Sequence, residues 1–452
     1  MDLGFETLGN ATVLAYDGGV PVLATDPWIR GPQYFGSWTL PYAFTPEQSE
    51  NLAKVSYVWL SHGHPDHLNL ESLETYRDKI LLVPAHRGDR IAKDLRGLGF
   101  KVQDLPSGQW LQLSPRVRIF SCADWNQDAA VLIAFGTRCA VLNLNDGGAL
   151  GTRAQLLREL LSFRTRFVLR LINYGDADMM NYFTESGERI RPIAGYPKPL
   201  GYEYSELLKR WHATHTAPFS CNHVYARTDS QWASEYETPQ DAHVRGFAAK
   251  RGQFIPGYFS YDVEQDRIEQ TPMISVPRTW RTPEEFGDHW DDPLEPAERA
   301  DVAAYIGKFE SLRDKFQFIN FRVGGRDNVI DLAGPKGVGI TFEAPRGSLM
   351  FAVRNEIFDD LLIGNFMKTT MHGGLRSLYP EFTPYVAKYG DNGRAFSREE
   401  LREYFTAYRQ EAGFHGWVDR MRVQGTRKVR NVLSANRNVY LFARRVYGYL
   451  KS

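Results

Sequence analysis

The chain has 452 residues, 43% of them hydrophobic, so it is long enough for two or three domains with apolar cores and is not disordered on a large scale. Lysine plus arginine and aspartate plus glutamate each number 54, so the balanced charge gives no reason to expect nucleic acid as a partner. Three scattered cysteines exclude a disulfide framework and an iron–sulfur cluster held by this chain alone, and they favour the cytoplasm. Because no apolar run approaches the about 18 to 20 residues of a transmembrane segment, we expect a soluble protein.

Two apolar segments near the start of the chain predict a β-hairpin. They cover residues 11–16 and 20–25 and are joined by the tight-turn sequence Asp17-Gly18-Gly19. An aromatic-rich loop follows. Its aromatic side chains either line a substrate pocket or pack in the core. Its arginine either binds a phosphate or carboxylate group or contacts only water. The candidate substrate-binding residues of this loop are Trp28, Arg30, Tyr34 and Trp38.

The next apolar segment, residues 55–60, predicts a buried strand, and Ser61-His62-Gly63-His64-Pro65-Asp66-His67 follows it directly. Because alternate residues of an extended segment point the same way, His62 and His64 can converge on one metal ion while Asp66 and His67 turn toward a second. Two ions about 3.5 to 4 Å apart can share a hydroxide that is nucleophilic near neutral pH. The alternative is a set of solvated or core histidines, and this H-x-H-x-D-H spacing makes it the weaker one.

Further strands are predicted at residues 80–83, 116–120, 130–135, 139–144 and 167–172, and helices at 88–98, 153–161 and 203–211. Strands interleaved with helices indicate a layered α/β sandwich. A pair of metal ions needs additional ligands, and those that follow later apolar segments are Asp124, with Asp128 in reserve, Asp146, which can bridge the ions, and His223. Taken singly, each carboxylate is a cap or turn residue more often than a ligand.

Composition also divides the chain into domains. The first domain is predicted over residues 1–285 and a proline-rich, acidic linker over 286–300. A smaller α+β domain with a helix at 398–412 follows over 301–452. Its end, residues 421–452, contains eight lysines and arginines and no acid. This basic tail can touch an anionic membrane surface peripherally, or it is a solvated helix face that packs on an acidic part of the same protein.

These motifs resemble the metallo-β-lactamase fold superfamily. The segments that carry the resemblance are residues 9–14, Thr25-Asp26-Pro27-Trp28, the H-x-H-x-D-H stretch, Asn145-Asp146-Gly147-Gly148 and His223. They are similar to the branch of ascorbate-phosphate lactonase and of the phospholipase D that acts on N-acylphosphatidylethanolamine, and most similar to the C-terminal part of CMP-N-acetylneuraminate hydroxylase. The strong motifs cover about residues 1–225, and the resemblance implies an αββα sandwich.

The resemblance also implies a ligand set of two divalent ions. His62, His64 and a third ligand would hold the first ion, Asp66, His67 and His223 the second, and Asp146 would lie between them. Most members carry a histidine in the third motif, where this chain has Asp124. A carboxylate there makes the site harder and moves its preference from zinc toward iron or manganese. The alternative sources of the missing nitrogen are His212 and His215.

Three functions are compatible with such a site. The preferred one is a metal-dependent hydrolase, in which a metal-bound hydroxide, activated by Asp146 or Asp66, attacks a phosphoester, lactone or amide of a small molecule. The second is a di-iron oxygen-activating enzyme, hydroxylase-like or monooxygenase-like, and a nucleotide-sugar-like substrate follows for it from the resemblance alone. The sialic-acid hydroxylase carries a Rieske domain, whose paired Cys and His spacing is missing here, so a separate electron donor would be needed. A non-catalytic metal-binding scaffold comes last.

Overall fold

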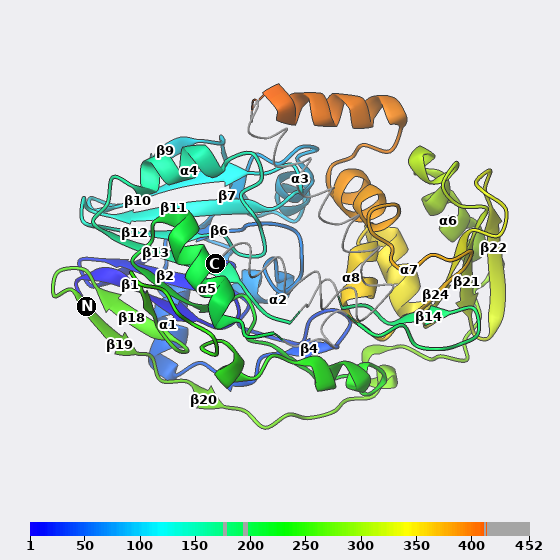
Figure 1. Cartoon of the computed structure of the whole chain (residues 1–452), viewed down its shortest axis with the longest axis horizontal. Helices are drawn as coiled ribbons and strands as arrows, with labels where there is room; N and C mark the ends of the chain where they lie inside the picture. Colours follow the sequence, from blue (N-terminus) through cyan, green and yellow to red (C-terminus); the bar gives the residue numbers. More distant parts are fainter. Residues whose placement is uncertain (175–178, 193–197, 411–412, 414–452) are drawn as a thin grey trace. The chain divides into compact units, whose positions relative to one another are not determined.

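The computed structural model describes residues 1–174, 179–192, 198–410 and 413. The chain divides into two compact units (Figure 1). Unit 1 comprises Met1–Asp176 and Pro197–Phe286, and unit 2 comprises Ala177–Tyr196 and Gly287–Ser452. A segment from the first half of the chain therefore belongs to the second unit, and the expected continuous first domain over residues 1–285 did not include this crossing.

The first sheet of unit 1 has eight strands in the order β19-β18-β1-β2-β3-β6-β7-β8. They are β1 (Leu3–Leu8), β2 (Thr12–Asp17), β3 (Val20–Thr25), β6 (Tyr57–Trp59), β7 (Ile80–Pro84), β8 (Lys101–Leu105), β18 (Phe259–Asp262) and β19 (Arg267–Gln270). The predicted hairpin is confirmed, because β2 and β3 pair antiparallel. Gly18 and Gly19 in its turn have φ of 65° and 72°, a conformation that glycine adopts without strain. From β3 to β8 the pairing is parallel.

The second sheet has seven strands in the order β17-β15-β13-β12-β11-β10-β9. They are β9 (Gln109–Gln112), β10 (Val117–Ala123), β11 (Ala129–Phe135), β12 (Cys139–Asn143), β13 (Thr165–Leu171), β15 (His215–Phe219) and β17 (Gln253–Phe254). The pairs from β12 to β17 are parallel. Unit 1 also contains two short ribbons, β4 (Trp38–Thr39) with β16 (Val224–Tyr225) and β5 (Tyr42–Ala43) with β20 (Ile274–Ser275).

An apolar layer joins the two sheets face to face. This buried cluster includes Phe5, Leu23 and Trp59 of the first sheet and Ile133 and Phe167 of the second. Phe5 is fully buried, and its ring lies 5.0 Å from that of Phe167 in an edge-on arrangement. Burying one such side chain stabilises a fold by about 1.5 to 3 kcal/mol.

Helices cover the outer face of each sheet (Figure 1). One further cluster lies between the first sheet and α1 (Pro46–Lys54), α2 (Leu70–Leu73) and α3 (Arg90–Gly97). Another lies between the second sheet and α4 (Arg153–Leu160) and α5 (Gly201–Trp211). The short helices of the unit are η1 (Glu74–Tyr76), η3 (Thr228–Tyr236), η4 (Gln240–Ala242) and η5 (Pro283–Phe286). The layers are helix, sheet, sheet, helix, so the predicted α/β sandwich is confirmed.

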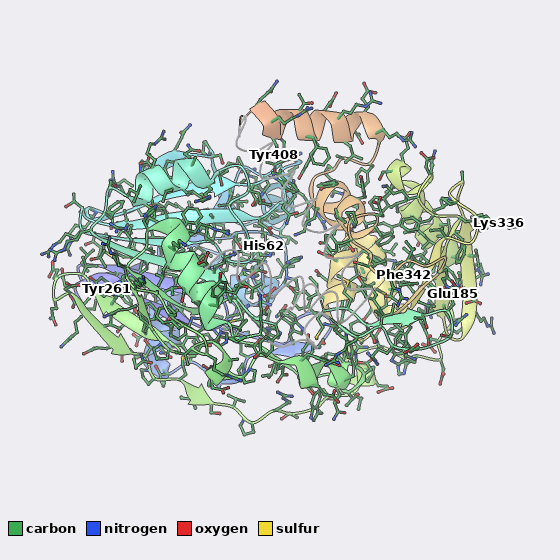
Figure 2. The ribbon with its side chains drawn as sticks, viewed as in Figure 1. His62, Glu185, Tyr261, Lys336, Phe342 and Tyr408 are labelled. Carbon is green, nitrogen blue, oxygen red and sulfur yellow. The ribbon has the colours of Figure 1, made fainter. Side chains whose placement is uncertain are left out.

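Unit 2 is an α+β unit around one five-stranded sheet in the order β14-β24-β23-β21-β22. Its elements are β14 (Tyr182–Thr184), α6 (Pro296–Gly307), η6 (Glu310–Leu312), β21 (Phe318–Val323), β22 (Arg326–Asp331), β23 (Gly339–Glu343), α7 (Arg346–Asn355), α8 (Phe358–Ile363), β24 (Lys368–Met371), the π-helix η7 (Pro384–Asn392) and a helix over 398–410. Phe342 packs in the core against the rings of Phe358 and Phe382 (Figure 2). β14 pairs parallel with β24, and Glu185 accepts a hydrogen bond from the backbone of Gly373 at 2.8 Å.

The expected linker over residues 286–300 includes the start of a helix. Pro296 occupies the first turn of α6, and Glu295 and Glu298 form a capping box at its N-terminus. These signals favour a helix start, so the acidic run is in part a helix cap rather than a connection. The basic tail over residues 421–452 lies outside the described residues. Within the described part of the chain, none of the helices combines the length and the apolar character needed to cross a bilayer.

Unit 1 buries a titratable pair in the layer behind the second sheet. His243 is 3% exposed, and its Nδ1 lies 3.0 Å from the hydroxyl of Tyr204 in α5. Burial lowers the pKa of His243 from 6.5 to about 4. The unfolded chain therefore takes up a proton here more readily than the folded one, so this stability is complete above about pH 6.5 and is lost as the pH falls toward 4.

We expect His243→Asn to reduce the acid sensitivity of unit 1, because asparagine keeps an acceptor for Tyr204 and does not titrate. From the pKa difference, the native chain should lose about 2 kcal/mol more than the variant between pH 7.5 and pH 5. Urea unfolding of both proteins at the two pH values, followed by tryptophan fluorescence, measures the difference. Parallel losses in the two proteins would contradict the assignment.

Candidate metal centre

The candidate ligands of unit 1 come from loops at one edge of the sandwich. The loop from Ser61 to His67 follows β6, Asp146 follows β12, and His223 follows β15. Parallel strands present their carboxyl ends at the same edge of a sheet, where ligand sites of α/β proteins lie. Within the first loop, the amides of His67 and Leu68 both donate to the carbonyl of His64, at 3.0 and 2.7 Å. This turn places both ends of the predicted motif at one site.

His62, His64 and Asp146 form a group that fits one metal ion. Nε2 of His62 lies 2.9 Å from Nδ1 of His64 and 3.8 Å from Oδ2 of Asp146, and the three donor atoms lie within 4.8 Å of one another. Ligands about 2.1 Å from a common tetrahedral ion would be about 3.4 Å apart. The spacing and the nitrogen and oxygen donors therefore fit a divalent cation after small shifts.

His67 is the centre of a second group. Its Nε2 lies 3.3 Å from Oδ2 of Asp66 and 3.4 Å from Oδ2 of Asp146. Oγ of Ser220 lies 3.3 Å from the same nitrogen and donates to Oδ1 of Asp146 at 2.6 Å. Asp146 thus faces both His62 and His67, as a ligand shared by two ions would. Ser220 was not among the predicted residues, and its φ of 56° at the end of β15 marks an unusual backbone position.

His223 lies flat against an aromatic ring beside these groups. Its ring stacks on Trp38 with the centroids 3.5 Å apart and the planes 5° from parallel. Burial lowers the pKa of His223 to about 4, while the carboxylates of Asp66 and Asp146 act in the opposite direction. The imidazole is therefore neutral at pH 7, which is the form that binds a metal. His223 shares the electrostatic environment of the two aspartates but lies outside the tight His62, His64 and Asp146 group.

Asp26 fixes the loop from Ser61 to His67 through hydrogen bonds, and it was not among the predicted site residues. Its carboxylate, fully buried, accepts from the backbone and hydroxyl of Ser61, both at 2.7 Å, and from Nδ2 of Asn145 at 2.5 Å. Its Oδ2 also lies 2.9 Å from Nδ1 of His67. A carboxylate against one ring nitrogen fixes the tautomer and leaves the other nitrogen facing the ligand. The available signal was an aspartate directly after a buried strand, in the Thr25-Asp26-Pro27-Trp28 stretch.

The carboxylates and His67 shift one another's pKa in opposite directions. Burial acts against the charged form of His67, but Asp66 and Asp146 outweigh it and raise its pKa well above 6.5. Burial would likewise raise the pKa of Asp66 and of Asp146, and the nearby histidines lower both instead. For Asp26, burial prevails and raises the pKa. The two carboxylates whose pKa is lowered, Asp66 and Asp146, thus gather negative charge that a metal cation would balance.

Asp124 holds its own loop in the structure. One carboxylate oxygen accepts from the amide of Asn126 at 2.8 Å and the other from the amide of Leu150 at 3.1 Å. Asp128 accepts from the side chain of Asn126 at 2.9 Å. Asp124 is not part of the His62, His64 and Asp146 group, so its role as a ligand stays a prediction.

The alternative nitrogen donors lie elsewhere. His215 begins β15, at the opposite end of the strand from Ser220, and stacks on Phe167 at 4.5 Å between the sheets. His212 is the C-cap residue of α5, at that same distant end. Neither residue is positioned to supply the missing ligand, because the length of β15 separates both from the carboxyl-end loops.

The four aromatic-loop candidates take different positions. Trp28 is fully buried, and its indole donates to the carbonyls of Arg30 and Gly31 at 3.1 and 2.8 Å. The side chain of Arg30 is exposed. Tyr34 donates to Oδ1 of Asp66 at 2.5 Å, and Trp38 stacks on His223. The last two therefore contact candidate ligands, and contact of any of the four with a substrate stays a prediction.

Known sequences match a short part of the chain, and no protein-family profile matches it. Cytidine monophosphate-N-acetylneuraminic acid hydroxylase of Asterias rubens is 28% identical over 109 residues, 23% of this chain and 17% of the relative. A Mycolicibacterium smegmatis protein named a Rieske 2Fe-2S iron-sulfur protein is 36% identical over 100 residues, 21% of this chain and 18% of the relative. The chain thus spans less than a fifth of the length of these two relatives.

Solved structures with a similar arrangement include metal-dependent enzymes. Igni18, a metallo hydrolase of Ignicoccus hospitalis, is 17% identical with a TM-score of 0.37, covering 57% of this chain and 98% of that one. CmlA, a diiron β-hydroxylase of Streptomyces venezuelae, is 17% identical with a TM-score of 0.31, covering 48% and 45%. YhfI of Bacillus subtilis, a metallo-β-lactamase fold protein, is 14% identical with a TM-score of 0.28, covering 47% and 78%.

The predicted sequence resemblance to the sialic-acid hydroxylases is confirmed over this short stretch of the chain. The candidate site rests on the layers, the strand ends and the donor atoms of the chain itself.

We expect Asp26→Asn to weaken metal binding, because an amide facing Nδ1 of His67 would move the ring proton to the nitrogen that should bind the ion. Loss of such a supporting carboxylate costs about 10-fold to 100-fold in metal affinity. Titration of the metal-depleted protein with Zn²⁺ by calorimetry measures the change. Asp17→Asn is the matched control, since Asp17 is also hydrogen-bonded, to Ser114 and Arg116, but in the β2–β3 turn. Equal affinities in Asp26→Asn and the native chain would remove Asp26 from the site.

Proposed function

We propose that the chain is a metal-dependent hydrolase of small molecules. The observation that carries the proposal is the meeting of His62, His64 and His67 around Asp146, a carboxylate from a different sheet. With Asp66 and His223, these residues supply six candidate ligands for two divalent ions. Zinc, manganese and iron all accept such a donor set, and iron or manganese is favoured if Asp124 joins it.

Bound ions would supply Lewis-acid activation of water and of the bond to be cleaved. The two candidate catalytic carboxylates, Asp66 and Asp146, differ in exposure and in hydrogen-bond partners. Asp66 has a side chain 3% exposed and accepts from Asn10 at 2.8 Å and from Tyr34. The side chain of Asp146 is 21% exposed, with Oδ2 directed toward His62 and His67. Asp146 is therefore the better acceptor for a proton from the attacking water, and Asp66 serves chiefly as a ligand.

The substrate class follows from the chemistry proposed. An activated water with a nearby proton acceptor suits a phosphoester, a lactone or an amide, and the site's buried carboxylates require that charge on the substrate be balanced by the ions. A cytoplasmic location is part of the proposal, on the low cysteine content. The same histidine-rich site would serve for any of these three substrate classes.

A di-iron oxygen-activating enzyme is the second candidate, and the sequence likeness to the hydroxylase relatives favours it. The matched relative from Mycolicibacterium smegmatis is named for a Rieske cluster. The paired Cys and His spacing of a Rieske site is missing from this sequence, so reduction would come from a separate electron-transfer protein.

We expect metal-dependent hydrolysis to distinguish the two candidates. The full chain, purified aerobically, should contain zinc or manganese by elemental analysis and should cleave at least one probe among nitrophenyl phosphoesters, a lactone and an anilide. Chelation should abolish the cleavage, and added metal should restore it. Two irons per chain, no hydrolysis, and dioxygen uptake with a ferredoxin and its reductase would instead establish the oxygenase and overturn the hydrolase.

We expect His64→Ala to lower turnover at least 100-fold and to reduce the bound metal, because one imidazole of the convergent group is lost. Elemental analysis and the probe assay measure both effects. His372→Ala is the control, since His372 is a partly buried histidine of unit 2 hydrogen-bonded to Thr341. If His64→Ala retained native metal content and activity, His64 would not be a ligand.

A further inference from the structure

One turn between Gln33 and Trp38 contacts two of the candidate ligands. Its ends are closed by two backbone hydrogen bonds between Gln33 and Trp38, at 2.8 and 3.0 Å. Within it, Tyr34 and Phe35 have φ of 50° and 58°, the left-handed region that bulky residues rarely adopt, and Gly36 follows at 91°. Conformations of this kind persist only where the surroundings impose them, and they gather at functional sites.

The surroundings of this turn do impose it. A side chain at Gly36 would meet the ring of Phe286 at 2.3 Å, so only glycine fits. The fully buried Arg227 donates to the carbonyl of Phe35 at 2.8 Å and is itself paired with Asp229 at 2.8 Å. The turn is therefore a fixed support and not a loop that adapts to its neighbours.

Two aromatic side chains of the turn, Tyr34 and Trp38, each contact one candidate ligand. The Tyr34 hydroxyl donates to Oδ1 of Asp66 at 2.5 Å, and the Trp38 ring covers the His223 ring at 3.5 Å. Both aromatic side chains are only 3% exposed. The indole N–H of Trp38 has no hydrogen-bond acceptor in the part of the chain that the structure describes, so the ring acts through its flat face.

We propose that Tyr34 and Trp38 are positioning residues for one ion of the pair, the ion held by Asp66, His67 and His223, and that they make this ion the more tightly bound of the two. The inference rests on the proposed metal-binding function. Asp66 is held on both oxygens, by Tyr34 and Asn10, and the ring of His67 is held by Asp26. Asp146 faces both groups, so the supports of Asp66, His67 and His223 are what favour this ion over the other.

Titration of the metal-depleted full chain with Zn²⁺ by calorimetry, and with Co²⁺ followed by its visible absorption, tests the proposal. The native chain should bind two ions with different affinities. Tyr34→Phe, which removes only the hydroxyl, should weaken the tighter ion about 10-fold or more and leave the weaker ion unchanged. Trp38→Leu should have the same selective effect, and Trp38→Phe, which retains a ring, should restore part of the affinity.

Tyr261→Phe is the matched control for the loss of a buried tyrosine hydroxyl. Tyr261 is 2% exposed and donates to Asp266 at 2.6 Å, and it lies away from His62 within unit 1 (Figure 2). Its two zinc affinities should equal those of the native chain. This comparison separates a general loss of stability from an effect on one ion.

The outcomes separate this inference from the proposed function. A native chain that binds no ion would overturn both, and a native chain that binds a single ion would overturn the inference alone. A native chain with two ions and Tyr34→Phe and Trp38→Leu variants with unchanged affinities would overturn the inference alone, as would equal weakening of both ions. If Tyr34→Phe does not fold, the two Trp38 variants test the inference: Trp38→Leu should weaken only the tighter ion, and Trp38→Phe should restore part of that affinity.

Discussion

The buried contact between His67 and three carboxylates is the constraint on which unit 1 depends. Asp26, Asp66 and Asp146 come from loops after different strands and reach the same imidazole within 2.9 to 3.4 Å. Burying such charged side chains costs several kcal/mol each unless groups of opposite charge lie beside them. The order of the parallel strands offsets this cost, because it brings all four groups to one edge. An apolar sandwich with the same layers would not need that alignment.

The supports around this cluster explain why two of the aspartates can differ in role. Asp26 and Asp66 have both oxygens engaged by neighbours within unit 1, and each is almost completely buried. Asp146 is the more exposed and faces two histidines. Preorganised groups hold a metal without reorganisation, whereas an accessible carboxylate can exchange a proton with water. In the proposed enzyme, the same loop edge would thus combine rigid ligands with an accessible proton acceptor.

Local patterns predicted the hairpin, the strands, the layered class and the H-x-H-x-D-H loop, because each depends on neighbouring residues. Asp146 was predicted from its place after a strand. Asp26 was missed as a site residue because its partner His67 is 41 positions away, and an aspartate after a buried strand does not by itself indicate that contact. Asp124 illustrates the opposite difficulty. An aspartate that follows a strand in the sequence can be either a metal ligand or a residue that caps its own loop. The hydrogen bonds from the amides of Asn126 and Leu150 to Asp124 indicate the loop-capping role.

Strand β14 has a consequence for how the protein is made. The ribosome synthesises it before most of its own sheet, and its partner β24 emerges only much later, after the rest of unit 1 is complete. During translation this strand is an open edge, able to pair with other chains. A stop codon near residue 286 would leave it permanently without its partner. Truncated products of this gene should therefore be aggregation-prone even though they retain all the candidate metal ligands of unit 1.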